Sequence, residues 1–250
     1  MKNFNRITAL GGDIAAAKAY SRKQAIFNEK AGFYARQGVI TTPGYLRLET
    51  LLTTGSISTI AWNTLDTSGI KLATERRLKL ADTFTITDIS FYIGTGASAV
   101  VSAPTAVEQA KEVLNTFPNQ QVPSIATMTD ELQSIYNGYL SLRVDTTTFL
   151  DSIPMLQFYR VGDVQAGTIT ATGGTTTNAS SWPLANFGRA ELLPTIELNG
   201  QANIEWTLTL PTSQTYTQPA STFTTVVLML NGFLNQGAAT VQRNIQKRLR

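Results

Sequence analysis

From residue 44 onward the chain consists of short runs in which apolar and polar residues alternate. In the clearest run, Ile204 to Leu210, every second residue is Ile, Trp or Leu, and Glu or Thr lies between them. Because successive side chains of a β-strand point to opposite faces, this period of two indicates a strand with one buried face. The same texture, with Gly, Pro, Asn and Asp between runs, predicts nine strands. They are Tyr45–Thr53, Ser56–Trp62, Gly69–Leu80, Phe84–Ile93, Tyr139–Phe149, Met155–Val161, Ala190–Leu198, Asn203–Leu210 and Phe223–Phe233.

The fourth of these strands changes phase within its length. Its apolar positions are 84 and 86 and then 89, 91 and 93, so one extra residue lies near Asp88. An extra residue on one strand of an antiparallel pair forms a β-bulge. We therefore expect a bulge near Asp88.

The segment ahead of the strands has the pattern of a helix. No proline occurs from Asp13 to Gln37, Asp13 suits an N-cap, and Gly38 and Pro43 suit the helix end. Apolar residues at helical spacing predict a stripe that most of the lysine and arginine residues avoid. Its members are Ala17, Tyr20, Phe27, Ala31 and Tyr34. Such a helix fits packing on protein, which the thin stripe favours, or a membrane surface, or nucleic acid.

Two further helices are predicted between the fourth and fifth strands. Residues Thr105–Phe117 carry apolar positions at helical spacing and end at Pro118, and a short helix is expected around Met128–Tyr136. Together they form a helical insertion at about 105–136.

No apolar run approaches the roughly 20 residues that span a bilayer, and the N-terminus lacks the pattern of a signal peptide. We therefore expect synthesis in a cytoplasm without secretion by a signal peptide.

The amino-acid composition limits the kinds of catalytic and metal site that the chain can form. The chain has no histidine and no cysteine, so it lacks the usual general base near neutral pH, the thiolate nucleophile and the two commonest zinc ligands. Carboxylate pairs of the glycosidase kind stay open. Threonine occurs 37 times, as often as all charged residues together, which suits strands. We expect no enzyme activity, no catalytic residue, no cofactor and no metal site.

Charge is separated along the chain. Residues 1–37 carry seven cations against Asp13 and Glu29, and residues 241–250 carry four cations and no acid, which leaves nine basic and fifteen acidic residues between them. Basic ends on an acidic body are typical of proteins that contact phosphates, anionic membranes or the acidic face of another copy. The candidate contact residues are Lys18, Arg22, Lys23, Lys30, Arg36, Arg243, Lys247, Arg248 and Arg250.

Two motifs inside the body have ordinary interpretations. The run from Gly94 to Ser98 lacks the third glycine of a dinucleotide site and the Gly-Lys-Ser/Thr of a phosphate loop, so a turn is expected. Arg76, Arg77 and Lys79 form the one basic cluster of the body. A solvated strand edge, a subunit contact and nucleic-acid binding explain this cluster about equally well.

The order of elements predicts a mainly β fold: an antiparallel β-sandwich of jelly-roll type with an N-terminal helical arm and a short helical insertion. The domains would be a basic helical arm at 1–38, the sandwich at 39–235 and a basic tail at 236–250. The 84–93 strand, the run Glu191–Gly200 leading into the 203–210 strand, and the run Val226–Phe233 carry a resemblance. In texture and order of elements the chain resembles the jelly-roll capsid proteins of tailless icosahedral bacteriophages. A compact double jelly roll, which needs about sixteen strands, is the alternative.

The resemblance implies a structural virion protein, a capsid subunit that self-assembles into an icosahedral shell with its basic termini facing genome or membrane. Its partners would be copies of itself, other virion proteins, and nucleic acid or the viral membrane, with no small-molecule substrate. Its location would be the virion. The alternative function is a carbohydrate-binding or receptor-binding β-sandwich of a fibre or spike, since one architecture hosts many functions.

Overall fold

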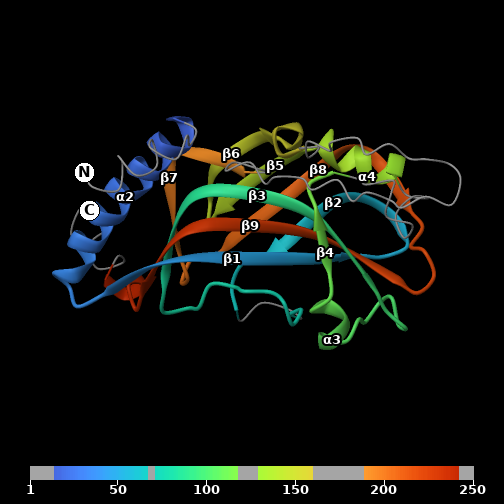
Figure 1. Cartoon of the computed structure of the whole chain (residues 1–250), viewed down its shortest axis with the longest axis horizontal. Helices are drawn as coiled ribbons and strands as arrows, with labels where there is room; N and C mark the ends of the chain where they lie inside the picture. Colours follow the sequence, from blue (N-terminus) through green and yellow to red (C-terminus); the bar gives the residue numbers. More distant parts are fainter. Residues whose placement is uncertain (1–13, 67–70, 118–128, 160–188, 242–250) are drawn as a thin grey trace, which may run out of the picture.

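The computed structural model describes residues 14–66, 71–117, 129–159 and 189–241. These residues form two antiparallel sheets packed face to face as a sandwich (Figure 1). The first sheet contains β1 (Ile40–Leu52), β9 (Thr222–Gln236), β3 (Thr83–Ala97), β7 (Arg189–Asn199) and β4 (Val113–Asn115). The second contains β2 (Gly55–Asn63), β8 (Ile204–Tyr216), β5 (Tyr139–Val144) and β6 (Thr147–Pro154).

The strand order is that of a jelly roll. The first sheet runs β1-β9-β3, with β7 and β4 both pairing with β3, and the second runs β2-β8-β5-β6. Along the chain, β1, β3, β7 and β9 of one sheet alternate with β2, the β5–β6 hairpin and β8 of the other. This connectivity confirms the predicted antiparallel jelly-roll sandwich. All strands of the described residues belong to this one sandwich, so they do not form the double jelly roll.

The core lies between the sheets and follows from the alternating pattern. Inward side chains from both sheets are fully or almost fully buried, among them Phe84, Phe91, Trp206 and Trp62. The indole nitrogen of Trp62 donates to the carbonyl oxygen of Val226 at 3.0 Å, so this large ring is buried without an unpaired donor. Burial of the apolar face of each strand is what holds the two sheets together.

Helix α4 (Thr129–Tyr136) contributes to the same core, and it confirms the helix predicted around 128–136. Leu132, Ile135 and Tyr136 have no exposed surface, and the Tyr136 ring lies edge-on to Phe91 with ring centroids 5.5 Å apart. The Tyr216 hydroxyl of β8 donates to the carbonyl oxygen of Glu131 at 3.1 Å. The helix therefore covers the sandwich as an integral part of it.

The predicted bulge is confirmed. Ile86 faces Gly232 of β9, but Asp88 faces Asn231, so Thr87 is the extra residue. On the other side of β3, Ile86 faces Ile196 and Asp88 faces Glu191, so β7 has four residues between the paired positions where β3 has one. This interruption of β7 contains the cis peptide bond between Leu193 and Pro194. The sheet ladder is thus broken at one place on two neighbouring strands.

Several predicted elements differ in the structure. The helix expected at 105–117 is one turn, α3 (Ala106–Gln109), whose Thr105 and Glu108 form a capping box, and it is followed by β4. The strand expected at 155–161 begins with a 3-10 helix, η2 (Met155–Phe158). The strand expected at 139–149 is the β5–β6 hairpin, which turns at Asp145 with φ of 53°. The apolar pattern of each of these segments is too short to distinguish a helix, a strand and a turn.

The strand expected at 69–80 is also wrong for its described part, 71–80. This segment makes two isolated bridges, from Arg76 to Arg47 of β1 and from Leu78 to Leu65, which follows the end of β2. It therefore runs along the open side of the sandwich between the edge strands β1 and β2. Its backbone bonds cover part of the β1 edge, which would otherwise expose unpaired backbone groups.

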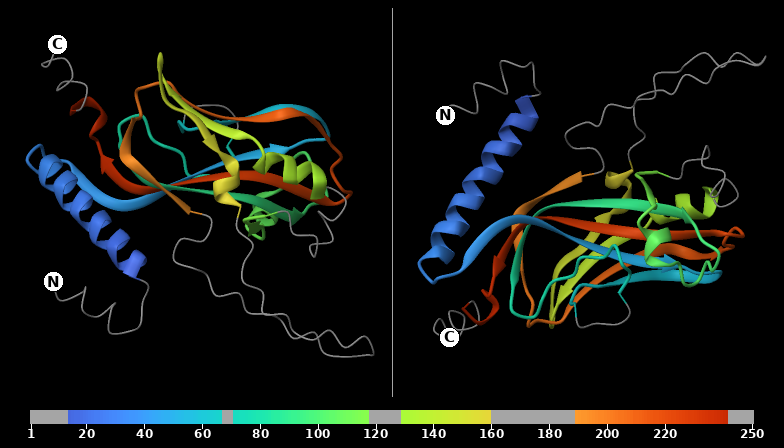
Figure 2. Two further views of the ribbon diagram at one scale, coloured as in Figure 1. Left: turned by 90° about the horizontal axis from the view of Figure 1, so that it is seen from above. Right: turned by 60° about the horizontal axis from the view of Figure 1, so that its bottom comes forward.

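Helix α2 (Ile14–Ala35) lies across one end of the sandwich and leads into β1 (Figures 1 and 2). Gly38 ends it with φ of 73°, and the Val39 amide donates to the carbonyl oxygen of Tyr34 at 3.1 Å. This is the glycine-terminated helix end that the sequence predicts. The helix packs on β1 of its own chain, the first of the three roles considered for it.

Candidate interaction site

In the described part of the chain, three ion pairs join helix α2 to the first sheet. Lys23 Nζ lies 2.7 Å from Asp88 Oδ2, and Lys30 Nζ lies 2.7 Å from Glu197 Oε2. Arg22 Nη1 lies 3.3 Å from Glu191 Oε2. Asp88 belongs to β3 and the two glutamates belong to β7. The candidate interaction site is this interface of α2 with the β3 and β7 strands.

The bulge places Asp88 at this interface. Its side chain is only 1% exposed, and Oδ2 also accepts a hydrogen bond from the Thr87 hydroxyl at 2.9 Å. Oδ1 is buried without a hydrogen-bond partner among the described residues. A buried carboxylate is costly unless a cation pairs with it. Lys23 therefore compensates a charge that the bulge keeps inside the protein.

The interruption of β7 gives Arg22 its second contact. Arg22 Nη2 donates to the carbonyl oxygen of Leu192 at 3.1 Å, inside the four-residue interruption. A carbonyl that leaves the sheet ladder needs another donor or water. The helix thus docks where the sheet leaves polar groups unpaired by strands.

The third contact is a cluster around Glu197. Its carboxylate accepts hydrogen bonds from the Tyr34 hydroxyl and from the Thr83 hydroxyl, the latter at 3.3 Å, beside its ion pair with Lys30. Burial raises the pKa of Tyr34, and the hydrogen bond to Glu197 raises it further. Tyr34 therefore stays a neutral donor over the physiological range, and the cluster carries a balanced charge.

Apolar contacts at this interface are few. The rings of Phe27 and Phe233 lie 5.2 Å apart, and Tyr34, Val39 and Ala238 form a small cluster of their own. No described side chain of α2 belongs to the main core. Beside Phe27 and Lys23 a pocket of about 380 Å³ remains between the helix and the sheet. Among the described side chains of α2 only Tyr34 is buried, so the ion pairs are the main specific contacts seen at this interface.

The predicted orientation of the cations on α2 is wrong for the described residues. Lys23, Phe27, Lys30 and Tyr34 follow one another at spacings of four, three and four, so they share one face of the helix. That face meets the sheet, whereas Tyr20 of the expected apolar stripe is half exposed. Acidic partners on β3 and β7 attract the lysines, and no pattern within the helix reveals partners more than 60 residues away.

The other predicted contact residues are distributed as follows. Arg36 is exposed after the end of α2 and forms no ion pair with the described residues. Lys18 lies in α2, but its side chain is outside the described part of the structure. The four predicted residues of the basic tail, Arg243, Lys247, Arg248 and Arg250, lie outside the described residues.

A second charged cluster, which sequence reasoning missed, lies on β1. Arg47 forms ion pairs with both Glu49 and Glu112, and Glu112 also accepts a hydrogen bond from the Thr225 hydroxyl. The Thr74 hydroxyl donates to the second oxygen of Glu49 at 2.9 Å. All four oxygens of the two carboxylates accept from protein side chains.

Beside this cluster a buried pair fixes the 71–80 segment. Arg77 Nη2 lies 2.7 Å from Glu75 Oε2, and both side chains are at most 2% exposed. Glu75 also accepts from the backbone amides of Glu49 at 3.0 Å and Leu72 at 2.8 Å. The bond from the Glu49 amide ties the segment to β1, beside the backbone bonds between Arg76 and Arg47.

Burial in the β1 cluster raises the pKa of both of its carboxyl groups. Burial raises the pKa of Glu49 to about 7, and the nearby Glu112 carboxylate adds to that rise. Burial also raises the pKa of Glu112. A raised pKa in a carboxylate pair is typical of catalytic acids, but both side chains are at most 2% exposed and their oxygens are engaged by protein donors. The geometry is that of a structural cluster.

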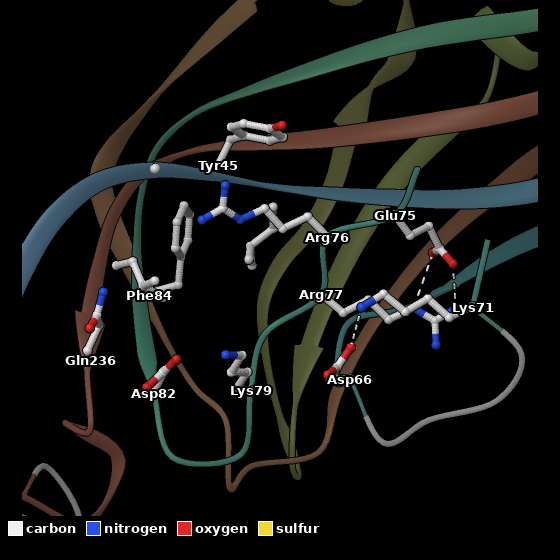
Figure 3. Close-up of a pocket in the computed structure, with 13 residues that line it drawn as sticks. Tyr45, Asp66, Lys71, Glu75, Arg76, Arg77, Lys79, Asp82, Phe84 and Gln236 are labelled. Atoms are coloured by element: carbon white, nitrogen blue, oxygen red, sulfur yellow. Dashed lines mark hydrogen bonds and ion pairs between the residues drawn. The ribbon is translucent and has the colours of Figure 1, made fainter. Parts of the chain in front are cut away.

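A polar pocket of about 390 Å³ opens beside the 71–80 segment. Figure 3 shows Arg76 and Lys79 reaching into it from that segment, with Tyr45 of β1 and Phe84 of β3 on the other wall. Asp82 and Gln236 complete the wall below Phe84. The basic cluster identified in the sequence therefore lines a concave surface.

No family model, curated protein or solved structure matches this chain. Within the described residues, no three acidic side chains gather in a way that would hold a metal ion. None of the described helices combines the length and apolarity needed to cross a bilayer. Inference about function therefore starts from the jelly roll and its charged surfaces.

Proposed function

We propose that this protein is a structural virion subunit whose copies self-assemble into an icosahedral shell. The jelly roll supports the proposal, because shells of many viruses are tiled by this fold, although lectins and cupins share it. A single sandwich with one helix across its end is the kind of compact unit that can contact several neighbours.

The observation that carries the proposal is the attachment of α2. The described side chains of α2 lie outside the main core, and three ion pairs join them to strands β3 and β7. An element attached in this way separates from the body at a lower cost than a core strand does. Such an arm suits a subunit that must contact neighbours of different orientation. The acidic residues it meets are equally able to receive a cation from another copy or to leave the basic arm free for genome or membrane.

Exposed apolar residues around α3 support contacts between copies. Val107 is 66% exposed, and Val100 and Val113 are also more than half exposed. Hydrogen bonds from the Ala99 amide and the Ser98 hydroxyl to Glu108 hold this region together. Three exposed valines along residues 100–113 are candidates for a contact with another copy, where their side chains would be buried. We propose the virion as the location and other copies as the main partners.

The test is the assembly state of the purified chain. Electron microscopy and sedimentation velocity should reveal closed shells or large oligomers at low salt, about 0.05 M, and weaker assembly near 1 M, because ion pairs at the surface are screened. The Val107→Asp variant should lose assembly and keep its fold. Lys111→Gln, an exposed change on the same segment, is the control. A monomer under every condition, with native circular dichroism, would overturn the proposal.

The carbohydrate-binding alternative has one supporting observation, the partly exposed Tyr45 ring at the mouth of the polar pocket. Its face is occupied, however, since the Arg76 guanidinium carbon lies 5.1 Å from the ring centroid. Binding to a glycan array by a monomeric protein would favour this alternative over the shell.

A further inference from the structure

The polar pocket beside β1 contains two cations without acidic partners. Of its four basic residues, Lys71 pairs with Asp66 at 2.6 Å and Arg77 pairs with Glu75. Arg76 and Lys79 form no ion pair with any described residue. Both are exposed and reach into the cavity in Figure 3. The pocket is therefore a concave site with two cations available to an anion.

The stacking of Arg76 on Tyr45 prepares the guanidinium for an anion. The guanidinium carbon lies 5.1 Å from the ring centroid, a cation–π contact. Such a contact occupies the face of the guanidinium, whereas its N–H donors lie in the plane and point outward. A planar fork of donors matches the oxygens of a phosphate. Tyr45 thus restrains Arg76 and leaves its donors free.

The opposite wall of the pocket carries a carboxylate, Asp82, and a side-chain amide, Gln236. Asp82 Oδ1 accepts from the Gly237 amide at 2.8 Å, while Oδ2 makes no hydrogen bond with the described residues. The side-chain amide of Gln236 is likewise without a partner there. A free carboxylate oxygen beside two cations disfavours a simple anion but suits a phosphate ester that also carries hydroxyl groups. Carboxylates bind ribose hydroxyls in nucleotide sites of other folds.

We propose that this pocket binds a nucleoside monophosphate unit. Arg76 and Lys79 hold the phosphate, Asp82 accepts from a sugar hydroxyl, and Gln236 meets polar groups of the sugar or base. The cavity of about 390 Å³ lies in the size range of small-ligand sites. The unit is either a free nucleotide or one residue of a single strand. The proposal does not depend on shell formation.

The experiment measures affinity for adenosine 5′-monophosphate and for a single-stranded oligonucleotide by calorimetry and ligand-observed NMR. The double variant Arg76→Gln/Lys79→Gln should weaken both by tenfold or more, and Asp82→Asn should weaken a ribonucleotide more than inorganic phosphate. Lys111→Gln, an exposed cation outside the pocket, should change affinity by less than about twofold. Circular dichroism and unfolding curves check that each variant is folded.

The outcomes distinguish a nucleic-acid strand from a free nucleotide as the ligand. They also distinguish failure of the pocket proposal from failure of the shell proposal. Tighter binding of the oligonucleotide, with a steep salt dependence, identifies a strand as the source, and equal or tighter binding of the mononucleotide identifies a free nucleotide. No binding at millimolar nucleotide, or equal binding by the double variant, overturns the pocket proposal and leaves shell assembly untouched. Loss of self-association in the double variant without nucleotide binding also overturns it, since the pocket is then a contact between copies.

Discussion

Lys23 Nζ lies 2.7 Å from Asp88 Oδ2 across the interface between α2 and the β3 bulge, and the Asp88 side chain is almost fully buried. Replacing Lys23 with Met would leave that carboxylate unpaired while α2 is docked. Loss of one partner of a buried pair costs several kcal/mol, but undocking of the helix exposes Asp88 to water and limits the cost. We therefore expect α2 to open more easily by about 2 kcal/mol, with a smaller change in global stability.

Hydrogen exchange is the measurement for this prediction. Amides of the described part of α2 should exchange roughly thirtyfold faster in Lys23→Met, the factor that about 2 kcal/mol implies, while those of β3 and β9 stay protected. Adding Asp88→Asn should restore most of the protection, because a neutral amide is cheaper to bury than a charge. Equal exchange in wild type and Lys23→Met would show that the pair does not hold the helix.

Salt should loosen the same helix. Arg22 and Glu191 are each about one third exposed, and exposed pairs are screened once the Debye length falls from about 10 Å to about 3 Å. Exchange of α2 amides should therefore rise several-fold between about 0.1 and 1 M salt. The strand amides serve as the internal control. A uniform change along the whole chain would point to general destabilisation instead.

The Glu49 carboxyl makes stability depend on pH. Its pKa rises from 4.5 in the unfolded chain to about 7 in the folded protein, chiefly through burial. Between these values the folded state holds more protons, so the free energy of unfolding falls as pH rises from about 4.5 to about 7. This contribution is fully present below the lower value and is lost above the upper one.

The Glu49→Gln variant tests that slope. The variant cannot ionise at this position, so relative to wild type it should gain on the order of 2 kcal/mol between pH 5 and pH 8. Urea unfolding at the two pH values measures the difference. The rise in the pKa of Glu112 acts in the same direction and remains in the variant. An unchanged difference between the two proteins across this range would contradict the prediction.

Two glycines give opposite predictions for the same substitution. Gly232 lies in β9, and a methyl group there would overlap the carbonyl oxygen of Thr85 on β3. Gly232→Ala should therefore lower the free energy of unfolding by about 3 kcal/mol or more, because the backbone must move.

Gly32 lies in α2 with open space around its Cα. Gly32→Ala should stabilise the helix by about 0.5–1 kcal/mol. Thermal unfolding and exchange at α2 measure the two effects.

Sequence patterns predicted the elements whose signal is local. Alternation identified most strands, and the phase shift at positions 84–93 identified the bulge, because one extra residue in a period of two is visible without the partner strand. The 71–80 segment was not predictable in this way. It alternates like a strand, yet its two bridges go to β1 and to Leu65 after β2, so its conformation depends on residues distant in the sequence.

The candidate sites also combine features that the local sequence reveals with features that depend on the fold. Arg76 and Lys79 stood out as a basic cluster, but nothing in the sequence shows that Tyr45 and Asp82 lie across a pocket from them. The β1 cluster gave no signal, since Arg47 and Glu112 are 65 positions apart and each resembles an ordinary surface charge. Pairing of distant charges depends on the fold, which the local pattern does not encode.

The amino-acid sequence by itself determined the jelly-roll class, the positive helix ahead of it and the place of the bulge, because periodicity, glycine ends and net charge are properties of neighbouring residues. Only the tertiary structure decided where the charges go. Folding brings β3 and β7 beside α2 and the 71–80 segment beside β1, so that three cations of the helix meet carboxylates while Arg76 and Lys79 stay free. The physical reason is that an ion pair requires two groups within about 4 Å, and for residues far apart in the chain the packing of the sheets alone sets that distance.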